Sequence, residues 1–470
     1  MNPVIHWFRR DLRLSDNSAL HAALATGAPV IPVFIFDPTL LKSERVGAPR
    51  VAWLLKGLHA LDADLKRWGS GLVIRHGDPL DVLRTLIAET NASAIYFNRD
   101  VSPYAYQRDT AILKAFPAHS FDDVLIHAPR EVHKDDGKPY TVYTPFRKRW
   151  ETLPKPAVLP LDRMNVHPLD GVRNEPIPSL ADLGFGSTID LPEAGETVAL
   201  RRLEQFVSEA IYTYADTRNR LIADPFGDAV GTSALSPYLR MGMLSPRQAY
   251  HAAARLLVDE QAISANERQS ISTWIGELAW RDFYAHILYH FPRVLHQSFK
   301  PEFDRLEYRQ ADDEFDRWLH GMTGYPVIDA AMRQMKQIGW MHNRARMIAA
   351  SFLTKDLLIY WRRGDLAFME RLIDGDPAAN NGGWQWSAGT GTDAQPYFRI
   401  FNPISQSARY DPEGAYIRAF VPELRDVPDK YIHAPWTAPT PPKSYPPPLV
   451  DHAVARQRTL DAFKQVRTTT

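Results

Sequence analysis

The residue types best suited to chemistry crowd into one short segment, residues 374–386. It reads Asp-Gly-Asp-Pro-Ala-Ala-Asn-Asn-Gly-Gly-Trp-Gln-Trp and so holds two acids, adjacent asparagines, adjacent glycines and two indoles. Glycine pairs and adjacent asparagines are poor helix formers. Acids and amides suit the polar edge of a planar ligand, glycines allow close approach, and indoles give flat contact. The segment predicts a ligand site; the alternative is an irregular interhelical loop anchored by tryptophan.

A second group of reactive side chains has helical spacing. Within residues 274–284, Glu277 is followed by Trp280, Arg281 and Tyr284, which are neighbours on one helix face. An acid beside an indole and a guanidinium suits recognition of a nucleic-acid base. The alternative is a Glu–Arg pair on a solvated face. Because the surrounding residues are aromatic, we favour the binding surface.

Residues 339–347 predict another polar face. Asn343 and Met347 are one helical turn apart, Arg346 lies beside them, and Arg344 is expected to point elsewhere, free for a phosphate. Helix capping explains Asn343 alone and leaves the adjacent His and two Arg unexplained.

Hydroxyls cluster just before Pro237 in residues 232–236, Thr-Ser-Ala-Leu-Ser. Hydroxyls and free backbone N–H groups at a helix start can bind phosphate. On this motif alone, plain N-capping is the favoured explanation. Upstream, Tyr212, Tyr214 and Arg218 share one predicted helix face, which is either an aromatic and cationic wall or an ordinary half-buried face.

Several other site classes lack support. The chain has no cysteine, which excludes disulfides, thiolate catalysis and cysteine-ligated metals. Its 16 histidines are scattered along the chain, so metal chemistry is poorly supported. Dinucleotide and P-loop glycine fingerprints are absent. A Ser-His-Asp triad is not excluded by spacing, but no Gly-x-Ser-x-Gly elbow is present.

Two kinds of architecture are predicted to position these groups. The first part alternates buried strands with helical periods, which predicts a parallel α/β sheet with right-handed crossovers. Ser15 or Asp16 is the expected N-cap of the first helix. The predicted strands are Val4–Phe8, Val30–Phe36, Leu72–His76 and Ala94–Asn98, and the predicted helices are Asn17–Ala25, Ala48–Trp68, Pro79–Glu89 and Pro103–Ala115.

Helical periods dominate the second part. Repeated prolines between residues 153 and 196 indicate a connector. We therefore expect α/β plus all-α architecture: a Rossmann-like domain over 1–130, a linker over 131–199 and a helical domain over 200–470. The predicted helices of the last are Leu200–Ala215, Pro246–Leu257, Ser270–Tyr289, Ala311–His320, Pro326–Gln337, Asn343–Ile359 and Leu366–Ile373.

Size and composition limit the partners. A chain of 470 residues exceeds one ordinary core. Its formal net charge is zero, so nucleic-acid binding requires a local basic patch. No signal peptide or membrane-spanning run is evident, so we expect a cytoplasmic protein without a membrane partner.

Taken together, these motifs resemble those of the photolyase/cryptochrome family, and within it the class I cyclobutane pyrimidine dimer photolyases. The resemblance covers essentially the whole chain, and long motifs in the same order make chance agreement negligible. The matching stretches are residues 7–17 (Trp-Phe-Arg-Arg-Asp-Leu-Arg-Leu-Ser-Asp-Asn), 232–236, 274–284, 323–332, 340–347 and, most densely, 374–401.

The resemblance implies an α/β antenna domain and a helical domain that binds FAD in a U shape. Arg346 would pair with Asp374 close to the isoalloxazine, and Asn380 would face flavin N5. Because an amide both accepts and donates, Asn380 would suit several redox states. The residues implied to bind the cofactor are Tyr214, Thr232, Ser233, Ala234, Leu235, Ser236, Arg281, Arg346, Asp374, Asp376 and Asn380.

Three tryptophans match the family's electron-transfer chain: Trp384, Trp361 and Trp318, the last as the terminal donor. Indole is readily oxidised, and a buried series lets a hole step towards the surface. Each of the three could instead be ordinary core, and the complete set carries the resemblance.

The implied reaction is light-driven DNA repair by an enzyme. Excited FADH⁻ donates an electron to a cyclobutane pyrimidine dimer, the ring splits, and the electron returns. The lesion is expected to leave the duplex to reach the pocket. Photolyases are a standard example of base flipping, so this expectation follows from the family and adds no independent support. The partner would be UV-damaged DNA, bound by a monomer.

The resemblance also assigns the lesion pocket. Glu277, Asn343 and Met347 would line it, with Trp280 and Trp386 as its aromatic wall. Backbone contacts would position the lesion without reading sequence. The residues implied to contact DNA are Arg218, Glu277, Trp280, Tyr284, Asn343, Arg344 and Gln406.

Two relatives within the family are alternatives. The (6-4) photolyases have a similar pocket, with histidine at the position of Asn343. A cryptochrome of the plant type carries Asp opposite flavin N5, where Asn380 favours repair. A flavin-free nucleic-acid binder would leave residues 374–386 unexplained.

The second, antenna chromophore is predicted from a few residues. Folate-type members resemble an Asn-Glu pattern near Tyr104-Ala105 that this chain lacks. Arg50 and residues 98–100, Asn-Arg-Asp, are more similar to deazaflavin binders. We therefore favour a deazaflavin over a folate, with an empty site or another flavin as alternatives.

Overall fold

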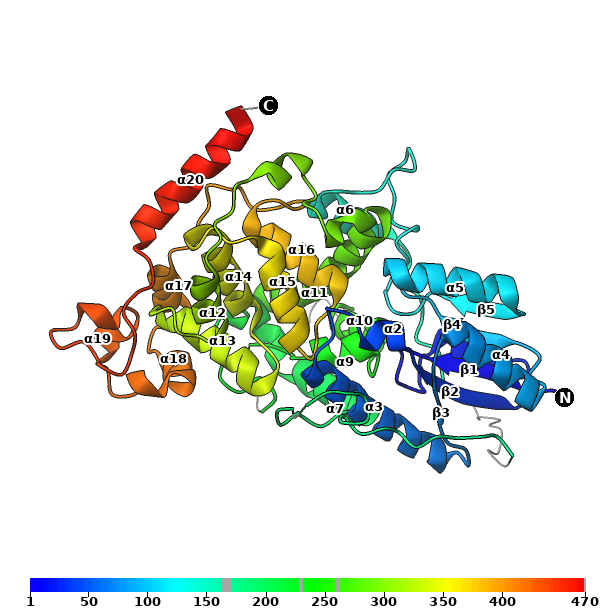
Figure 1. The fold of residues 1–470 in the computed structure, drawn as a ribbon. Helices are drawn as coiled ribbons and strands as arrows, with labels where there is room; N and C mark the ends of the chain where they lie inside the picture. The colour runs from blue at the N-terminus through cyan, green and yellow to red at the C-terminus, as the bar shows by residue number, and fades with distance from the viewer. Residues whose placement is uncertain (162–170, 187, 228–230, 259–262, 469–470) are drawn as a thin grey trace. The chain divides into compact units, whose positions relative to one another are not determined.

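The computed structural model describes residues 1–161, 171–186, 188–227, 231–258 and 263–468 (Figure 1). Their contacts divide the chain into two compact units. The first unit comprises Met1–Thr188, Pro192–Ala215 and Ser233–Pro292, and the second comprises Ile189–Leu191, Asp216–Thr232 and Arg293–Thr470. The predicted domain limits at residues 130 and 200 stay a prediction.

The first unit is built on a five-stranded parallel sheet in the order β3-β2-β1-β4-β5. The first four strands were predicted. The fifth was missed because its sequence, Ala-His-Ser-Phe, is only partly buried and has no apolar run. The strands are β1 (Val4–Phe8), β2 (Val30–Phe36), β3 (Val73–His76), β4 (Ile95–Asn98) and β5 (Ala118–Phe121).

Helices connect the strands, and all of them except α3 begin at a residue whose side chain caps the helix. Asp78 and Ser102 cap α4 and α5, each with proline in the first turn. The first helix is capped by Asn17, which accepts from Leu20 N, so the predicted caps Ser15 and Asp16 were wrong. The helices are α1 (Ser18–Leu24), α2 (Pro38–Leu41), α3 (Ala48–Arg67), α4 (Pro79–Thr90) and α5 (Pro103–Ala115).

A buried ion network explains much of the motif at residues 7–17. Arg13 pairs with Asp123, and Arg247 donates to Asp16 at 3.1 Å and to Asp123 at 2.7 Å. Burial alone would raise the pKa of Asp123, but the two guanidiniums hold it well below its ordinary value. The network joins the loop after β1 to α10 (Pro246–Ala254). The motif is therefore structural.

The rest of the first unit is helical. The predicted helix over 200–215 instead begins at Glu196 and ends at Ser208, because Glu209 leaves the helical region at φ −136° and ψ −70°. The described residues between α6 and α7 form no helix or strand, as expected of a connector. The elements are α6 (Tyr143–Thr152), α7 (Glu196–Ser208), η1 (Ala210–Thr213), α8 (Tyr214–Thr217), α9 (Ser236–Met241), α10, η2 (Arg255–Leu257) and α11 (Ala265–His290).

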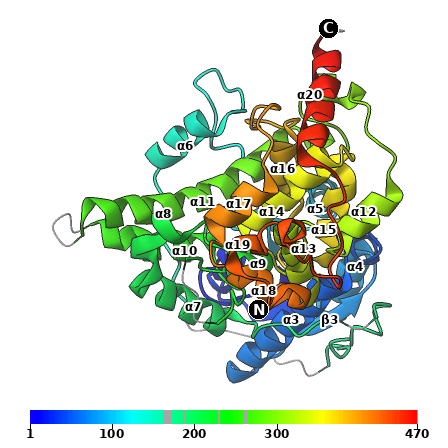
Figure 2. The ribbon, with the colours of Figure 1, turned by 90° about the vertical axis from the view of Figure 1, so that its left-hand side faces the viewer.

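The second unit has no strand among its described residues, which confirms the α/β plus all-α prediction (Figure 2). Its core is one large apolar cluster around α13, α14, α15 and α16. The elements after α11 are η3 (Pro292–Leu295), η4 (Pro301–Arg305), α12 (Asp312–Leu319), α13 (Pro326–Ile338), α14 (Asn343–Ser351), the π-helical turn η5 (Phe352–Asp356), α15 (Trp361–Arg371), α16 (Pro377–Ala388), α17 (Pro403–Tyr410), α18 (Ala415–Phe420), η6 (Pro422–Leu424), α19 (Asp429–Ile432), η7 (Pro435–Thr437) and α20 (His452–Thr468).

One predicted helix in this unit ends early, and helix α16 was not predicted. The helix expected over 343–359 instead ends at Asp356, after a wider π-helical turn that begins at Phe352, and Leu358 adopts a left-handed φ of +51°. The segment from Pro377 to Ala388, which local propensity disfavours, is a helix. Among the described residues, no helix is both long enough and apolar enough to cross a lipid bilayer.

Candidate functional site

Helix α16 carries most of the segment that the sequence singled out. Asp376 caps its start, accepting from Ala378 N at 2.9 Å and Ala379 N at 3.1 Å. Gly389 ends it with φ +79°, and its N–H bonds back to Gln385 O and Trp386 O. Caps at both ends therefore offset the poor propensity of the asparagine and glycine pairs.

Asn380 has a fixed orientation on α16. Its Nδ2 donates to Asp365 O at 3.0 Å and to Asp365 Oδ1 at 2.7 Å, which uses both amide hydrogens. The group that this side chain can offer a ligand is therefore its oxygen. The proposed placement of Asn380 opposite flavin N5 stays a prediction.

Open space adjoins Asn380 on the same helix face. Gly383 lies three residues on, and a Cβ added there would meet none of the described atoms within 4 Å. A glycine that leaves room beside an acceptor oxygen fits a planar, polar-edged group. An acceptor oxygen beside open space is what the N–H edge of a flavin ring requires, so these two residues are compatible with that group.

Asp374 is buried and paired as expected. Arg346 on α14 donates to it through Nη2 at 2.8 and 3.1 Å and to Met341 O through Nε at 2.8 Å. The side chain of Asp374 is 3% exposed and that of Arg346 is 25% exposed, so the carboxylate is desolvated while the guanidinium stays partly accessible. Its geometry fixes the start of the loop that leads into α16.

The start of α14 is capped by His342, whose Nδ1 accepts from Arg344 N at 3.1 Å. Burial, together with the guanidiniums of Arg344, Arg346 and Arg218, lowers the pKa of His342 to about 3, so the ring is neutral and Nδ1 can accept. Asn343 is exposed and Met347 half-buried, one turn apart. The capping explanation for Asn343 was therefore wrong.

An arginine cluster lies beside this helix start. Arg344 donates to Asn219 Oδ1 at 2.7 Å, and its guanidinium lies 4.6 Å from the centroid of the Tyr410 ring. The expectation that Arg344 is free of protein partners was therefore wrong. Burial and the nearby guanidiniums of Arg218 and Arg409 lower its pKa. We call Arg218, Arg344 and Arg409 the arginine cluster. Three cations this close form a local positive field suited to phosphate.

Gln406 lies on α17, the helix that also carries Arg409. Its side-chain oxygen is buried and has no hydrogen-bond partner among the described residues. The predicted role of Gln406 in contacting DNA stays a prediction.

The three predicted tryptophans are all deeply buried. Trp384 packs against α15, where a Cβ on Gly364 would lie 2.1 Å from its ring, and its ring centroid is 6.0 Å from that of Trp318. Trp318 is 0% exposed and donates to Ala349 O, so it does not itself reach the surface. Trp361 is also fully buried, and its ring lies 5.4 Å from that of Tyr360.

Trp386 points away from this cluster. Two residues on a helix are about 200° apart, so the side chains of Trp384 and Trp386 project from opposite sides of α16. Trp384 is buried at 2% exposure, whereas Trp386 is half-buried. One helix thus presents one indole to the core and another to its accessible side.

In the first unit, α11 presents the predicted stripe. Glu277, Trp280, Arg281 and Tyr284 are half-buried, whereas the intervening Leu278, Ala279, Asp282 and Phe283 are buried. Trp280 stacks on Tyr143, with ring centroids 3.5 Å apart and planes within 9°. The aromatic surroundings that favoured a binding surface are present.

Arg281 has a structural task within this stripe. It donates to Val124 O at 2.5 Å and to Leu239 O at 3.4 Å. These contacts tie the loop after β5 and helix α9 to α11. They account for Arg281 without a cofactor, and its predicted cofactor role stays a prediction.

Residues 232–236 precede α9 as expected, but their hydroxyls do not cap it. The N-cap is Leu235, whose side chain makes no capping bond, so the N-capping explanation was wrong. Ser233 accepts from Trp274 Nε1 at 3.4 Å, and Ala234 has a left-handed φ of +45°. Thr232 is half-buried, Ser236 is exposed, and Tyr214 is buried against Phe206 with ring centroids 6.0 Å apart.

The residues expected to bind a second chromophore have protein partners. Asn98 bonds to Ala19 N, Asp11 Oδ2 and Asn17 Oδ1. Asp100 pairs with Arg10 at 2.8 Å, and Arg99 bonds to Ser120 and Asp122. Arg50 donates to Arg45 O. These side chains form contacts between the loops of the first unit, so their presence adds no support to the prediction of a deazaflavin.

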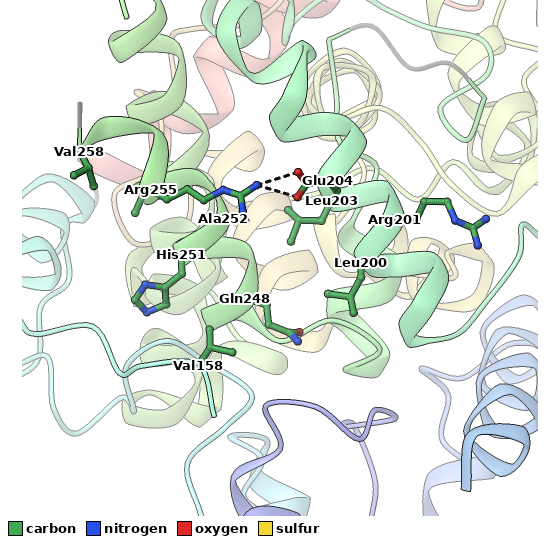
Figure 3. A pocket seen from close by; sticks show the side chains of 11 residues that line it. Val158, Leu200, Arg201, Leu203, Glu204, Gln248, His251, Ala252, Arg255 and Val258 are labelled. Carbon is green, nitrogen blue, oxygen red and sulfur yellow. Dashed lines mark hydrogen bonds and ion pairs between the residues drawn. The ribbon is translucent and has the colours of Figure 1, made fainter. Parts of the chain in front are cut away.

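A groove of about 870 Å³ lies between α7 and α10 of the first unit (Figure 3). Its walls carry Leu200, Leu203 and His251, and Arg255 pairs with Glu204 at 2.9 Å. It contains none of the predicted site residues. In the described part of the chain, no group of three or more His, Cys, Asp or Glu side chains could hold a metal ion.

Sequence reasoning missed the residues that orient the site. Asp365 fixes Asn380, Asn219 holds Arg344, and Tyr143 covers one face of Trp280. Asp282 accepts from Ile126 N, His127 N and Trp150 Nε1, and burial raises its pKa to about 6. These contacts join residues 15 to 156 positions apart, so no local spacing signals them.

Comparison with known proteins agrees with the fold and with these motifs. Residues 4–163 match the family model described as DNA photolyase, and residues 274–465 match that of the FAD binding domain of DNA photolyase. A curated deoxyribodipyrimidine photo-lyase of Synechococcus sp. is 40% identical, with 99% of this chain and 97% of the relative covered.

Two solved structures extend the comparison. A bacterial class III photolyase from Agrobacterium tumefaciens has a TM-score of 0.90 at 39% identity and covers 100% of this chain and 98% of its own. The Synechocystis sp. PCC6803 cryptochrome has a TM-score of 0.88 at 28% identity and covers 98% of this chain and 99% of its own.

Proposed function

The chain belongs to the DNA photolyase family, and from that premise we propose that it is a light-driven DNA repair enzyme, a deoxyribodipyrimidine photo-lyase that splits cyclobutane pyrimidine dimers with FAD. One observation carries the proposal: the oxygen of Asn380, oriented by Asp365, adjoins the open space at Gly383. This geometry lies inside the region that matches the FAD binding domain.

The residues of the second unit would hold the cofactor by its polar edge. Asn380 would accept a hydrogen bond from a reduced ring N–H, and the Asp374–Arg346 pair would border the ring. Asp376 would retain its capping bonds and border the ribityl chain. When bound and excited in its reduced form, FAD supplies the single electron that opens a cyclobutane ring.

The roles proposed for the lesion-binding residues follow from the family resemblance. Glu277 would hydrogen-bond the damaged base, Asn343 and Met347 would line the pocket, and Trp280 and Trp386 would stack on the flipped bases. The arginine cluster would bind the DNA backbone around the lesion and so position it without reading sequence. Tyr284 and Gln406 complete the proposed DNA contacts.

The two alternatives within the family are less well supported. Asn343, rather than a histidine, stands at the position where (6-4) photolyases have histidine, and it is exposed as a pocket residue should be. Asn380 stands at the position where plant-type cryptochromes carry Asp, and this residue type favours repair. Identity is also higher with the named photolyase than with the cryptochrome, 40% against 28%.

The decisive experiment is illumination of the reduced protein with DNA that contains a defined thymine dimer. Restored thymines should accumulate only in the light and only with reduced FAD bound. Parallel substrates with a (6-4) photoproduct should remain unrepaired. Binding of FAD without repair of either lesion would refute the enzyme and favour a light receptor.

For the second chromophore, the proposal remains a deazaflavin in preference to a folate. It rests on the missing Asn-Glu pattern at Tyr104-Ala105 alone, because Arg50 and Asn98 have structural partners. The absorbance spectrum of the protein purified from its own host distinguishes a deazaflavin, a folate, a second flavin and FAD alone.

A further inference from the structure

A fully buried lysine lies behind helix α16. Lys355 is 0% exposed and stands in the π-helical turn η5 between α14 and α15. Its Nζ donates to Ala388 O at 2.6 Å. Ala388 is the last residue of α16, where carbonyls lack partners within the helix and carry the negative end of its dipole. The lysine therefore caps the carboxyl end of α16.

The C-terminal helix α20 encloses this lysine, and α20 and η5 are in contact. Lys355 Nζ lies 3.9 Å from the centroid of the Phe463 ring, a cation–π contact. The Thr459 hydroxyl donates to Lys355 O. The neighbouring charges are paired: His452 binds the Asp356 carboxylate, and Arg458 donates to Asp356 O.

We propose that Lys355 is a positioning residue for α16. By holding Ala388 O, it fixes the carboxyl end of the helix, and with it Trp386 two residues earlier and the rotation of Asn380 about the helix axis. The inference rests on the proposed function, because that function gives both side chains their tasks. Helix α20 completes the device by excluding water from the lysine.

The choice of lysine is informative because a buried ammonium is costly. Burial alone lowers the pKa of Lys355 to about 7. An apolar side chain of the same volume would fill the site without this cost. What an apolar side chain cannot supply is a donor to the end of α16. The gain is therefore local order in α16 rather than stability of the whole unit.

The test compares Lys355→Met with Lys336→Met, a control at an exposed lysine on α13. In FAD-loaded protein, Lys355→Met should speed amide hydrogen exchange in residues 384–391 at least about tenfold, the factor expected for one lost charge-assisted hydrogen bond. Exchange in α13 should not change, and the midpoint of thermal unfolding at pH 7 should stay equal or rise. Lys336→Met should change neither.

Lys355→Gln, which keeps an N–H donor on a shorter chain, is the second variant and carries the test if Lys355→Met does not fold. It should show intermediate exchange. Unchanged exchange in both variants, or faster exchange spread equally over α13 and α16 with a lower unfolding midpoint, would overturn the inference. If the wild type fails to repair dimers, the proposed function fails while the exchange result still decides the role of Lys355.

Discussion

At the scale of a single residue, the role proposed for Glu277 in repair can be tested separately from FAD binding. It is half-buried on the accessible stripe of α11, beside the stacked pair of Trp280 and Tyr143. Glu277→Ala should lower the dimers repaired per absorbed photon about tenfold or more, as expected when a hydrogen bond from a charged group is lost. FAD content, read from visible absorbance, should stay at the wild-type value. Undiminished repair would remove Glu277 from the pocket.

Trp318 tests the electron path at the same scale. Its ring centroid lies 6.0 Å from that of Trp384, and the indole is wholly buried. Trp318→Phe preserves the packing but replaces indole with a ring that is much harder to oxidise. Photoreduction of oxidised FAD, followed by absorbance, should slow, whereas pre-reduced enzyme should repair normally. An unchanged photoreduction rate would direct the path through Trp361 and Tyr360 instead.

At the scale of the element, two variants of Asp376 distinguish its role as the N-cap of α16 from its proposed role at the cofactor. Asp376→Ala removes two bonds accepted from the helix start and should cost about 1 kcal/mol in the free energy of unfolding. Asp376→Asn retains the cap, since asparagine caps equally well, and should unfold at the wild-type urea concentration. A drop in FAD affinity in Asp376→Asn at unchanged stability would locate the charge, rather than the cap, at the cofactor.

The same helix shows what sequence reasoning could reach. The composition of residues 374–386 predicted a ligand site, and the family resemblance gave Trp384 and Trp386 different tasks, which stay predictions. That α16 is a helix was missed, since its order comes from Asp376 and Gly389 at the ends and from Lys355 behind it, which is 33 residues away from its partner. Four strands were predicted from apolar runs, and β5 lacked one.

At the scale of the whole molecule, the buried lysine should leave a signature in the dependence of stability on pH. The pKa of Lys355 is about 7 when folded and 10.5 ordinarily, so between these values the unfolded chain binds more protons. The free energy of unfolding should therefore rise with pH across that window, by at most about 1.4 kcal/mol per pH unit. Urea unfolding at several pH values gives the free energy of unfolding of the wild type and of Lys355→Met, and the difference between them isolates the contribution of Lys355. The same dependence on pH in both proteins would contradict the prediction.

The last whole-molecule property is how a chain of zero net charge binds a polyanion. Attraction must come from a local patch, and the arginine cluster supplies one, with Arg409 exposed at its edge. Each phosphate contact releases counterions, so Arg409→Ala should reduce the slope of log affinity against log salt for dimer-containing DNA by about 0.9. Arg201→Ala makes the same charge change on α7 at the groove wall and should leave the slope unaltered. If the slope of log affinity against log salt is the same in both variants, the DNA backbone does not contact the arginine cluster at Arg409.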